Sequence, residues 1–191
     1  EDGTKPKVFN YTGPTSLNLD ENCRYPEIDF TQYVTVTDNC GLNSVQQHLD
    51  VTGSFLTIQI TAKDNAGNTN TPFSKIIDLI DITPPVLTCP FSFTVNSDPG
   101  SCGANITNIG TAKATDACDA NVRIQVDGEK NFYPVGNTTI TYTAFDDAGN
   151  TATCIQTITV LDWEKPEIVC PAPVSVSCVA DIPSVNIAQV T

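Results

Sequence analysis

Hydrophobic residues alternate with polar ones along much of this chain, which is the period expected of half-buried β-strands. From Thr139 to Ala144 the order Thr-Ile-Thr-Tyr-Thr-Ala places every second side chain on one apolar face. The same alternation occurs at Leu56, Ile58, Ile60 and Ala62, and on the face shared by Cys154, Ile158 and Val160. Helical periodicity with a capping signal is not found in any stretch of useful length. The pattern therefore predicts an all-β chain.

Four blocks of sequence recur in the same order about 80 positions apart, which indicates an internal repeat. The matched blocks are 62–69 with 144–151, 81–85 with 162–166, 89–90 with 170–171, and 37–40 with 115–118. We therefore divide the chain into a first repeat at 1–80, a second at 81–161, and the start of a third, truncated repeat at 162–191. The whole is interpreted as a window on a longer array.

Each predicted repeat contains short strands separated by turn signals. The motif Asp-x-Ala-Gly-Asn at 64–68 and 146–150 supplies a glycine where a hairpin needs a positive φ. Repeats of about 80 residues with this spacing of turns favour a β-sandwich. Four aromatic residues on alternating positions are expected in the core: Phe91, Phe93, Phe132 and Tyr142.

Composition narrows the class of protein. The chain has 22 acidic and 9 basic residues among 191, for a net charge of −13. Such a chain lacks the basic face that nucleic acid requires, and no apolar run is long enough to insert into a membrane. Eight cysteines occur without zinc-site spacing, which favours structural disulfides and hence an extracellular or cell-surface location.

The second repeat resembles the hyalin repeat (HYR) domain. The residues that carry the resemblance are Asp81-x-x-Pro-Pro, Cys89-Pro90, Asp98-Pro99-Gly100-x-Cys102, Asp116-x-Cys118, Phe132-Tyr133-Pro134-Val135-Gly136, Tyr142-Thr143-Ala144 and Asp147-Ala148-Gly149-Asn150-Thr151-Ala152-x-Cys154. The first repeat is a weaker match and the third retains only the opening. The resemblance implies tandem immunoglobulin-like β-sandwiches used in extracellular adhesion, and it brings no catalytic residues.

The cysteine pattern predicts intradomain disulfides. The first repeat lacks cysteines matching Cys89 and Cys154, and cysteines that are lost together are expected to be partners. This pairs Cys89 with Cys154, Cys102 with Cys118, and Cys23 with Cys40. Cys170 and Cys178 are expected to have partners beyond residue 191 or to be free.

No catalytic constellation is evident, and we expect that the chain is not an enzyme. His48 is the sole histidine and lies in a polar stretch typical of a surface. Glycosylation sequons begin at Asn10, Asn105 and Asn137. They would be used only in a eukaryotic secreted protein, and chance matches in a chain rich in Asn and Thr are the alternative.

No cofactor is required by any motif, and calcium is the one ion that the acidic turns suggest. In an immunoglobulin-like sandwich the turn with Asp146 and Asp147 lies where the chain enters, close to Asp81 in the linker. Asp116 joins this set if its loop shares that end of the repeat. The matching acids of the first repeat are Asp38 and Asp64, with Glu1 or Asp2 in the linker. The alternative is a turn that needs no ion.

The function predicted from these observations is mechanical: a disulfide-braced spacer or adhesive stalk in a long surface or filament protein. Its expected partners are neighbouring repeats, further copies in a homopolymer, or a surface glycan or protein ligand. The alternatives are a carbohydrate- or protein-binding module that uses loop tips, and an accessory domain of a secreted enzyme.

Overall fold

The computed structural model describes residues 2–170, and over this range the chain is all-β, as the alternation predicts. One short 3-10 helix, η1 (Phe30–Tyr33), interrupts the strands. The strands are β1 (Lys7–Phe9), β2 (Ser16–Asn18), β3 (Thr35–Thr37), β4 (Leu42–Thr52), β5 (Phe55–Asp64), β6 (Phe73–Ile80), β7 (Val86–Thr88), β8 (Phe93–Asn96), β9 (Gly103–Asn105), β10 (Lys113–Thr115), β11 (Arg123–Asp127), β12 (Phe132–Pro134), β13 (Gly136–Phe145) and β14 (Thr151–Leu161).

The chain forms two compact units. The first comprises Glu1–Cys89, Thr111–Asp127 and Thr141–Ile155, and the second comprises Pro90–Gly110, Gly128–Ile140 and Gln156–Thr191. The repeat boundaries at 80/81 and 161/162 stay a prediction. Most of the predicted third repeat lies outside the described residues, together with Cys178 and Glu1.

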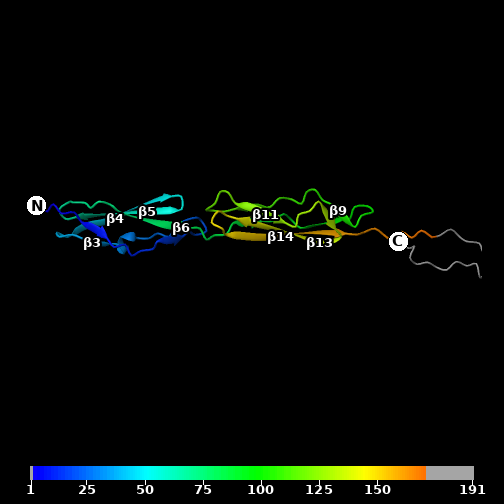
Figure 1. Cartoon of the computed structure of the whole chain (residues 1–191), viewed down its shortest axis with the longest axis horizontal. Coiled ribbons are helices and arrows are strands. Elements are labelled where there is room, and N and C mark those ends of the chain that lie inside the picture. The colour runs from blue at the N-terminus through cyan, green and yellow to red at the C-terminus, as the bar shows by residue number, and fades with distance from the viewer. Residues whose placement is uncertain (1, 171–191) are drawn as a thin grey trace, which may run out of the picture. The chain divides into compact units, whose positions relative to one another are not determined.

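The first unit contains a four-stranded sheet with the order β2-β6-β5-β4. Its long strands β4, β5 and β6 are labelled in Figure 1. The long strands β4, β5 and β6 pair antiparallel, and the short β2 joins the edge of β6 in parallel. Strands β1 and β3 form a separate two-stranded sheet. The parallel β2–β6 pair matters below, because it fixes where the chain leaves β2 relative to the end of β6.

The core of the first unit lies on the predicted face of β5. Leu56, Ile58 and Ile60 are fully buried, and they pack with Ile77 of β6 and Phe30 of η1. Asp29 caps η1 by accepting a hydrogen bond from the Thr31 N–H, so the helix starts where Phe30 can turn inward. The period-two pattern has thus placed its apolar face against the core, as expected.

A second four-stranded sheet has the order β11-β13-β14-β8, in which β8 pairs parallel with β14 as β2 pairs with β6. The two-stranded sheets β10-β7 and β12-β9 accompany it. Ile140, Tyr142 and Ala144 of β13 are buried, as their alternation predicts. The two four-stranded sheets therefore share one connection order, which agrees with the internal repeat.

Gln156 is a polar residue that the second unit buries completely. It stands on the face of β14 that also carries Ile158 and Val160. Its side-chain amide nitrogen donates to the carbonyl oxygens of Phe91 and Ile109, each at 2.8 Å. A buried amide with satisfied hydrogen bonds ties these two loop carbonyls to the strand.

Of the four aromatic residues expected in the core, two are exposed and Phe93 is only half-buried. Phe91 is 93% exposed because it precedes β8, so strand alternation does not apply to it. Phe132 is 44% exposed because Tyr133, its neighbour in β12, occupies the inward position. Tyr142 is buried as predicted. Among residues 2–170 no helix has the length and apolar character needed to cross a membrane.

The buried face of β5 yields a stability prediction. Ile58→Ala should lower the free energy of unfolding by about 2–5 kcal/mol, because it removes buried methyl groups and leaves a cavity. Ile76→Ala on the neighbouring strand β6 is the matched control, since Ile76 is 59% exposed. Its effect should stay within about 0.5 kcal/mol. Urea denaturation measures both variants, and equal losses would contradict the assigned faces.

Candidate functional site

A buried carboxylate closes the turn between β5 and β6. Asp64 is 1% exposed, and its two oxygens accept hydrogen bonds from the backbone N–H and the side-chain amide of Asn68, at 2.8 and 2.7 Å. Gly67 has φ of +97°, which a residue with a side chain adopts only at a cost. The glycine of the motif Asp-x-Ala-Gly-Asn thus has the positive φ that the sequence predicts, and the structure adds that the first and last residues of the motif are bonded to each other.

The second copy of the motif has the same geometry between β13 and β14. Asp146 is 2% exposed and accepts from the backbone N–H and side-chain amide of Asn150, at 2.7 and 2.8 Å. Gly149 has φ of +93°. The agreement of the two turns, residue by residue, means that observations on one can be transferred to the other.

The asparagine of each turn also holds the segment that enters the repeat. The Asn68 amide donates to the carbonyl of Asp2 at 3.1 Å, and the Asn150 amide donates to the carbonyl of Asp81 at 3.2 Å. Asp2 and Asp81 each accept a bond from the backbone N–H two residues later, at 2.9 Å in both cases. The entering segment is therefore anchored in the same way at both positions.

The ionisation of the first of these clusters follows from its hydrogen bonds. The Thr4 backbone N–H, with smaller effects from Cys40 and Asn39, holds the pKa of Asp2 below its usual value. Burial acts to raise the pKa of Asp64, but the bonds from Asn68 outweigh it and the net pKa is lowered. The hydrogen bond to Asp2 raises the pKa of the Cys40 thiol, and burial and nearby carboxylates add to this effect.

Two groups of side chains have the spacing that a metal ion needs. In one, single atoms of Asp2, Asp38 and Asp64 all lie within 4.8 Å of one another, and in the other the atoms belong to Asp81, Asp116 and Cys118. The structure thus brings Asp81 and Asp116 together, as the calcium prediction requires. The second group has only two carboxylates, and the sulfur of its Cys118 is bonded to another cysteine. Only the first group therefore offers three carboxylates.

The other two residues of the predicted calcium set are placed differently. Both oxygens of Asp146 accept bonds from Asn150, as both oxygens of Asp64 do from Asn68. Asp147 is exposed, and its backbone N–H donates to a carboxylate oxygen of Asp119 at 2.8 Å. Neither belongs to a three-residue group in the described part of the chain, whereas the matching Asp64 does. Calcium binding itself stays a prediction.

One predicted disulfide is present in the structure: Cys89 is bonded to Cys154, with their Cα atoms 5.9 Å apart. It joins the segment after β7 to the middle of β14. The pairing follows from the argument that these two cysteines are absent together from the first repeat.

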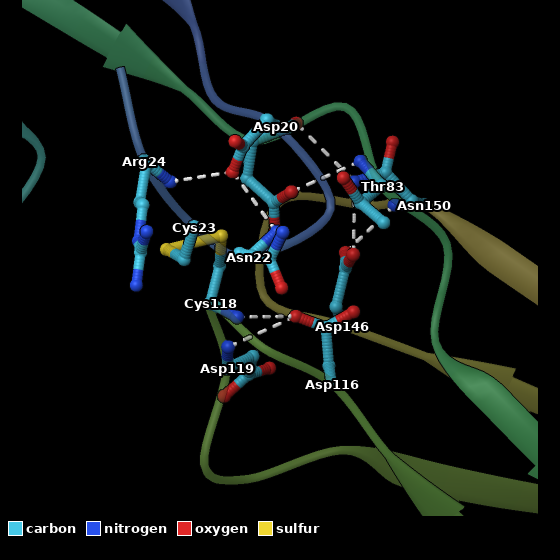
Figure 2. The surroundings of a disulfide bond; sticks show 11 residues. Asp20, Asn22, Cys23, Arg24, Thr83, Asp116, Cys118, Asp119, Asp146 and Asn150 are labelled. Carbon is cyan, nitrogen blue, oxygen red and sulfur yellow. Dashed lines mark hydrogen bonds between the residues drawn. A yellow bond between two sulfur atoms is a disulfide. The ribbon is translucent and has the colours of Figure 1, made fainter. Parts of the chain in front are cut away.

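The other two predicted pairings are wrong, because Cys23 is bonded to Cys118, with their Cα atoms 5.1 Å apart (Figure 2). Cys40 and Cys102 are free and exposed. The bond therefore links the first predicted repeat to the second instead of closing a loop inside either one.

The distance along β5 explains why Cys23 does not bond Cys40. Cys23 follows Leu19, whose N–H bonds the Ile80 carbonyl, near the Phe55 end of β5. Cys40 lies beside Asp64, at the opposite end of the strand. A strand of ten residues spans about 30 Å, far beyond the reach of a disulfide. The predicted Cys102–Cys118 bond fails in turn because Cys118 is already bonded to Cys23.

Both halves of the Cys23–Cys118 bond stand on turns held by an aspartate (Figure 2). Asp20 accepts from the backbone N–H groups of Asn22 and Arg24, each at 2.9 Å, and Cys23 itself has φ of +60°. Asp116 accepts from the N–H of Cys118 at 2.7 Å and from that of Asp119 at 3.0 Å. The two sulfurs are thus carried on short, internally bonded turns.

The sequence contained a signal for this crosslink. Cys23 and Cys40 match Cys102 and Cys118 at offsets of 79 and 78 positions. These offsets are the same whether the two cysteines of one copy are bonded to each other or each copy is bonded to the next. Spacing alone does not distinguish the two, because that requires the positions of the cysteines at the ends of the strands.

The remaining predicted site residues lie on the surface. Asn10, Asn105 and Asn137 are exposed, and the Asn105 amide donates to Asp98 while the Asn137 oxygen accepts from Thr159. Their glycosylation stays a prediction. His48 is exposed on β4, opposite Gln59 of β5.

Comparison with known proteins relates the sequence of this chain to one family. The HYR domain model matches residues 80–160. Hyalin of Strongylocentrotus purpuratus is 30% identical over 180 residues, which cover 90% of this chain and 15% of that protein. Hyalin of Lytechinus variegatus is 25% identical over 190 residues, which cover 94% of this chain and 34% of that protein.

Among solved structures, human mucin-like protocadherin EC1-2 aligns over 82% of this chain and 98% of that chain, with 13% identity and a TM-score of 0.36. The assignment therefore depends on the sequence matches and not on this alignment. The chain spans only a small part of the curated relatives it matches. Residues 80–160 of this chain match the HYR domain family, and the two sea-urchin hyalins are similar over most of the chain.

Proposed function

We propose that this chain is an extracellular structural module, in which HYR-type repeats act as a spacer or adhesive stalk braced by disulfides. The observation that carries the proposal is the Cys23–Cys118 bond. It adds a second covalent connection to the peptide linkage at 80/81 between the first and second predicted repeats. Two connections restrict a hinge more than one does, and resistance to bending and pulling is what a spacer needs.

Three further observations support this role. The linker after residue 80 is held by the bond from the Asn150 amide to the Asp81 carbonyl, and it continues into Pro84-Pro85, which favours an extended backbone. Structural disulfides persist in oxidising compartments, which suits an extracellular protein. The net charge of −13 keeps neighbouring molecules apart in solution.

Pulling on the two ends of the chain tests whether the Cys23–Cys118 bond transmits load. In the native chain the shortest covalent path between the ends crosses both disulfides. In Cys23→Ser it crosses only Cys89–Cys154, so the fully unfolded chain should be longer by about 37 residues, or about 130 Å. Single-molecule force extension measures this change in contour length.

Cys102→Ser is the matched control, because Cys102 is a free cysteine at the corresponding position of the second predicted repeat. Its contour length should equal that of the native chain. A reducing agent should extend all three proteins to the same full length. If the native chain and Cys23→Ser unfold to equal lengths under oxidising conditions, the brace and the proposed spacer role both fail.

We also propose that calcium binds the first acidic group, made of Asp2, Asp38 and Asp64. The observation in favour is that one oxygen of Asp2 and one of Asp38 are shielded from solvent without a hydrogen-bond donor among the described residues. Carboxylate oxygens without donors in a group of three acids are unfavourable unless a cation lies among them. Turn carbonyls and water would supply the rest of the six to eight ligands that calcium takes.

Calcium should therefore raise the stability of the first unit. Extracellular calcium modules bind with dissociation constants of about 0.1–1 mM, so 10 mM calcium should add about 1.4–2.7 kcal/mol to the free energy of unfolding. Differential scanning calorimetry with calcium and then with a chelator measures the shift in Tm. Asp38→Asn should abolish the shift, because it removes a charged ligand.

Asp147→Asn is the control for net charge, since Asp147 lies outside the acidic groups of the described residues. It should keep the full calcium response. An unchanged Tm in the native protein, or equal responses in both variants, would contradict a site at Asp2, Asp38 and Asp64.

A further inference from the structure

Cys40 and Cys102 are exposed cysteines without a partner in the described part of the chain. Each occupies the position that, in the other predicted repeat, is crosslinked. Cys102 corresponds to Cys23 and Cys40 corresponds to Cys118. The Cys23–Cys118 bond in the same chain thus shows which partner each free cysteine lacks.

The turn that carries Cys102 is similar to the turn that carries Cys23 and is one residue longer. In the first, the N–H of Asp98 bonds the Gly103 carbonyl at 2.8 Å, and in the second the N–H of Asp20 bonds the Arg24 carbonyl at 2.9 Å. The cysteine directly precedes the accepting residue in both turns. Each turn follows a short strand that pairs parallel with the last strand of its repeat.

The turn that carries Cys40 is likewise similar to the turn that carries Cys118. The N–H of Cys40 donates to Asp38 at 2.9 Å, as that of Cys118 donates to Asp116 at 2.7 Å. Each cysteine comes three residues after a short strand, β3 or β10, that pairs with the first strand of its repeat. Cys40 therefore presents its thiol from the same kind of turn as Cys118.

The chain beyond the second repeat begins as the linker between the first two does. The N–H of Glu164 donates to Asp162 at 3.0 Å, as the N–H of Thr83 donates to Asp81 at 2.9 Å. The Glu164 carboxylate also accepts from the Gly100 N–H, at 2.8 and 3.0 Å, next to the turn of Cys102. The start of a following repeat is thus held beside Cys102.

We infer that Cys102 and Cys40 are the two halves of a crosslink that repeats along an array, in which each repeat is bonded to the next. Cys102 pairs with the cysteine equivalent to Cys118 in the repeat that follows it. Cys40 pairs with the cysteine equivalent to Cys23 in a repeat that precedes it. The inference rests on the proposed function and names the partner: an adjoining repeat of the same type, joined in tandem.

Each such bond is formed by oxidation of two thiols. The sulfurs of Cys102 and of its partner join in one S–S bond, and two protons and two electrons leave. A disulfide oxidant such as glutathione disulfide accepts them and becomes two glutathione thiols.

A tandem duplication of the full chain tests the inference. Residues 2–161 occur twice in succession, so that Leu161 of the first copy precedes Asp2 of the second. Residues 162–191 follow the second copy. Asp2 forms the same turn as Asp81 and Asp162, and five positions separate both Asp2 from Lys7 and Asp81 from Val86, so the register of the junction is kept. Cys102 of the first copy then faces Cys40 of the second.

Two variants of the duplicated chain form a matched pair. The junction variant carries Cys40→Ser in the first copy and Cys102→Ser in the second, so the free cysteines meet at the new junction. The end variant carries the reverse substitutions, so they lie away from it. Serine retains a hydroxyl that can donate to Asp2, as the thiol of Cys40 does. Both chains are oxidised with glutathione disulfide and purified as monomers.

A protease that cleaves on the N-terminal side of aspartate separates the relevant cysteines. Cys102 then falls in the peptide 98–115 and Cys40 in the peptide 38–49. Mass spectrometry of the unreduced digest should find these peptides joined in the junction variant. Alkylation should label two fewer thiols in it than in the end variant, where both peptides should be recovered unlinked.

The Cys23–Cys118 and Cys89–Cys154 peptides in the same digest report that both chains have folded. If those bonds are present while Cys102 and Cys40 of the junction variant are alkylated, the inference is wrong and the proposed function stands. It is also wrong if Cys102 is joined to the peptide 162–180. Loss of the Cys23–Cys118 bond itself would overturn both the inference and the brace.

Discussion

A buried carboxylate bonded to the asparagine four residues later is the interaction on which the connection between the first and second predicted repeats depends. Asp64 with Asn68, and Asp146 with Asn150, close their hairpins with nearly equal geometry. The asparagine amide has a further bond to the carbonyl of the entering segment. One short motif therefore shapes the turn, fixes the incoming chain and brings the acids of neighbouring loops together.

The crosslink depends on this arrangement at one side and on the parallel β2–β6 pair at the other. Because β2 runs alongside the end of β6, the turn with Cys23 is next to Ile80, where the chain enters the linker. Because Asp81 is held by Asn150, and Asp116 lies in the same group as Asp81, Cys118 is close to that linker as well. The disulfide is thus a consequence of where the strands end.

The acidic groups and the cysteines share these turns. The proposed calcium site and the proposed crosslink between repeats therefore involve neighbouring residues. In the group with Cys118, the sulfur is bonded to Cys23 and two carboxylates remain. In the group of Asp2, Asp38 and Asp64 three carboxylates converge, and the nearby Cys40 thiol donates to Asp2. A bond formed by Cys40 would remove the thiol donor, and Oδ1 of Asp2 would still accept from Thr4 and Asn39.

The sequence by itself determined the features that depend on local periodicity. Alternation along β5 and β13 predicted the buried faces, the glycines of the hairpins predicted positive φ, and the shared absence of two cysteines predicted Cys89–Cys154. Motif order also identified the HYR resemblance. Only the tertiary structure decided that Cys23 joins Cys118, because a repeat offset is the same for bonds within and between copies. It likewise decided that Phe91 is exposed, Gln156 buried and Asp147 outside the acidic groups, since these depend on where strands begin and which loops meet.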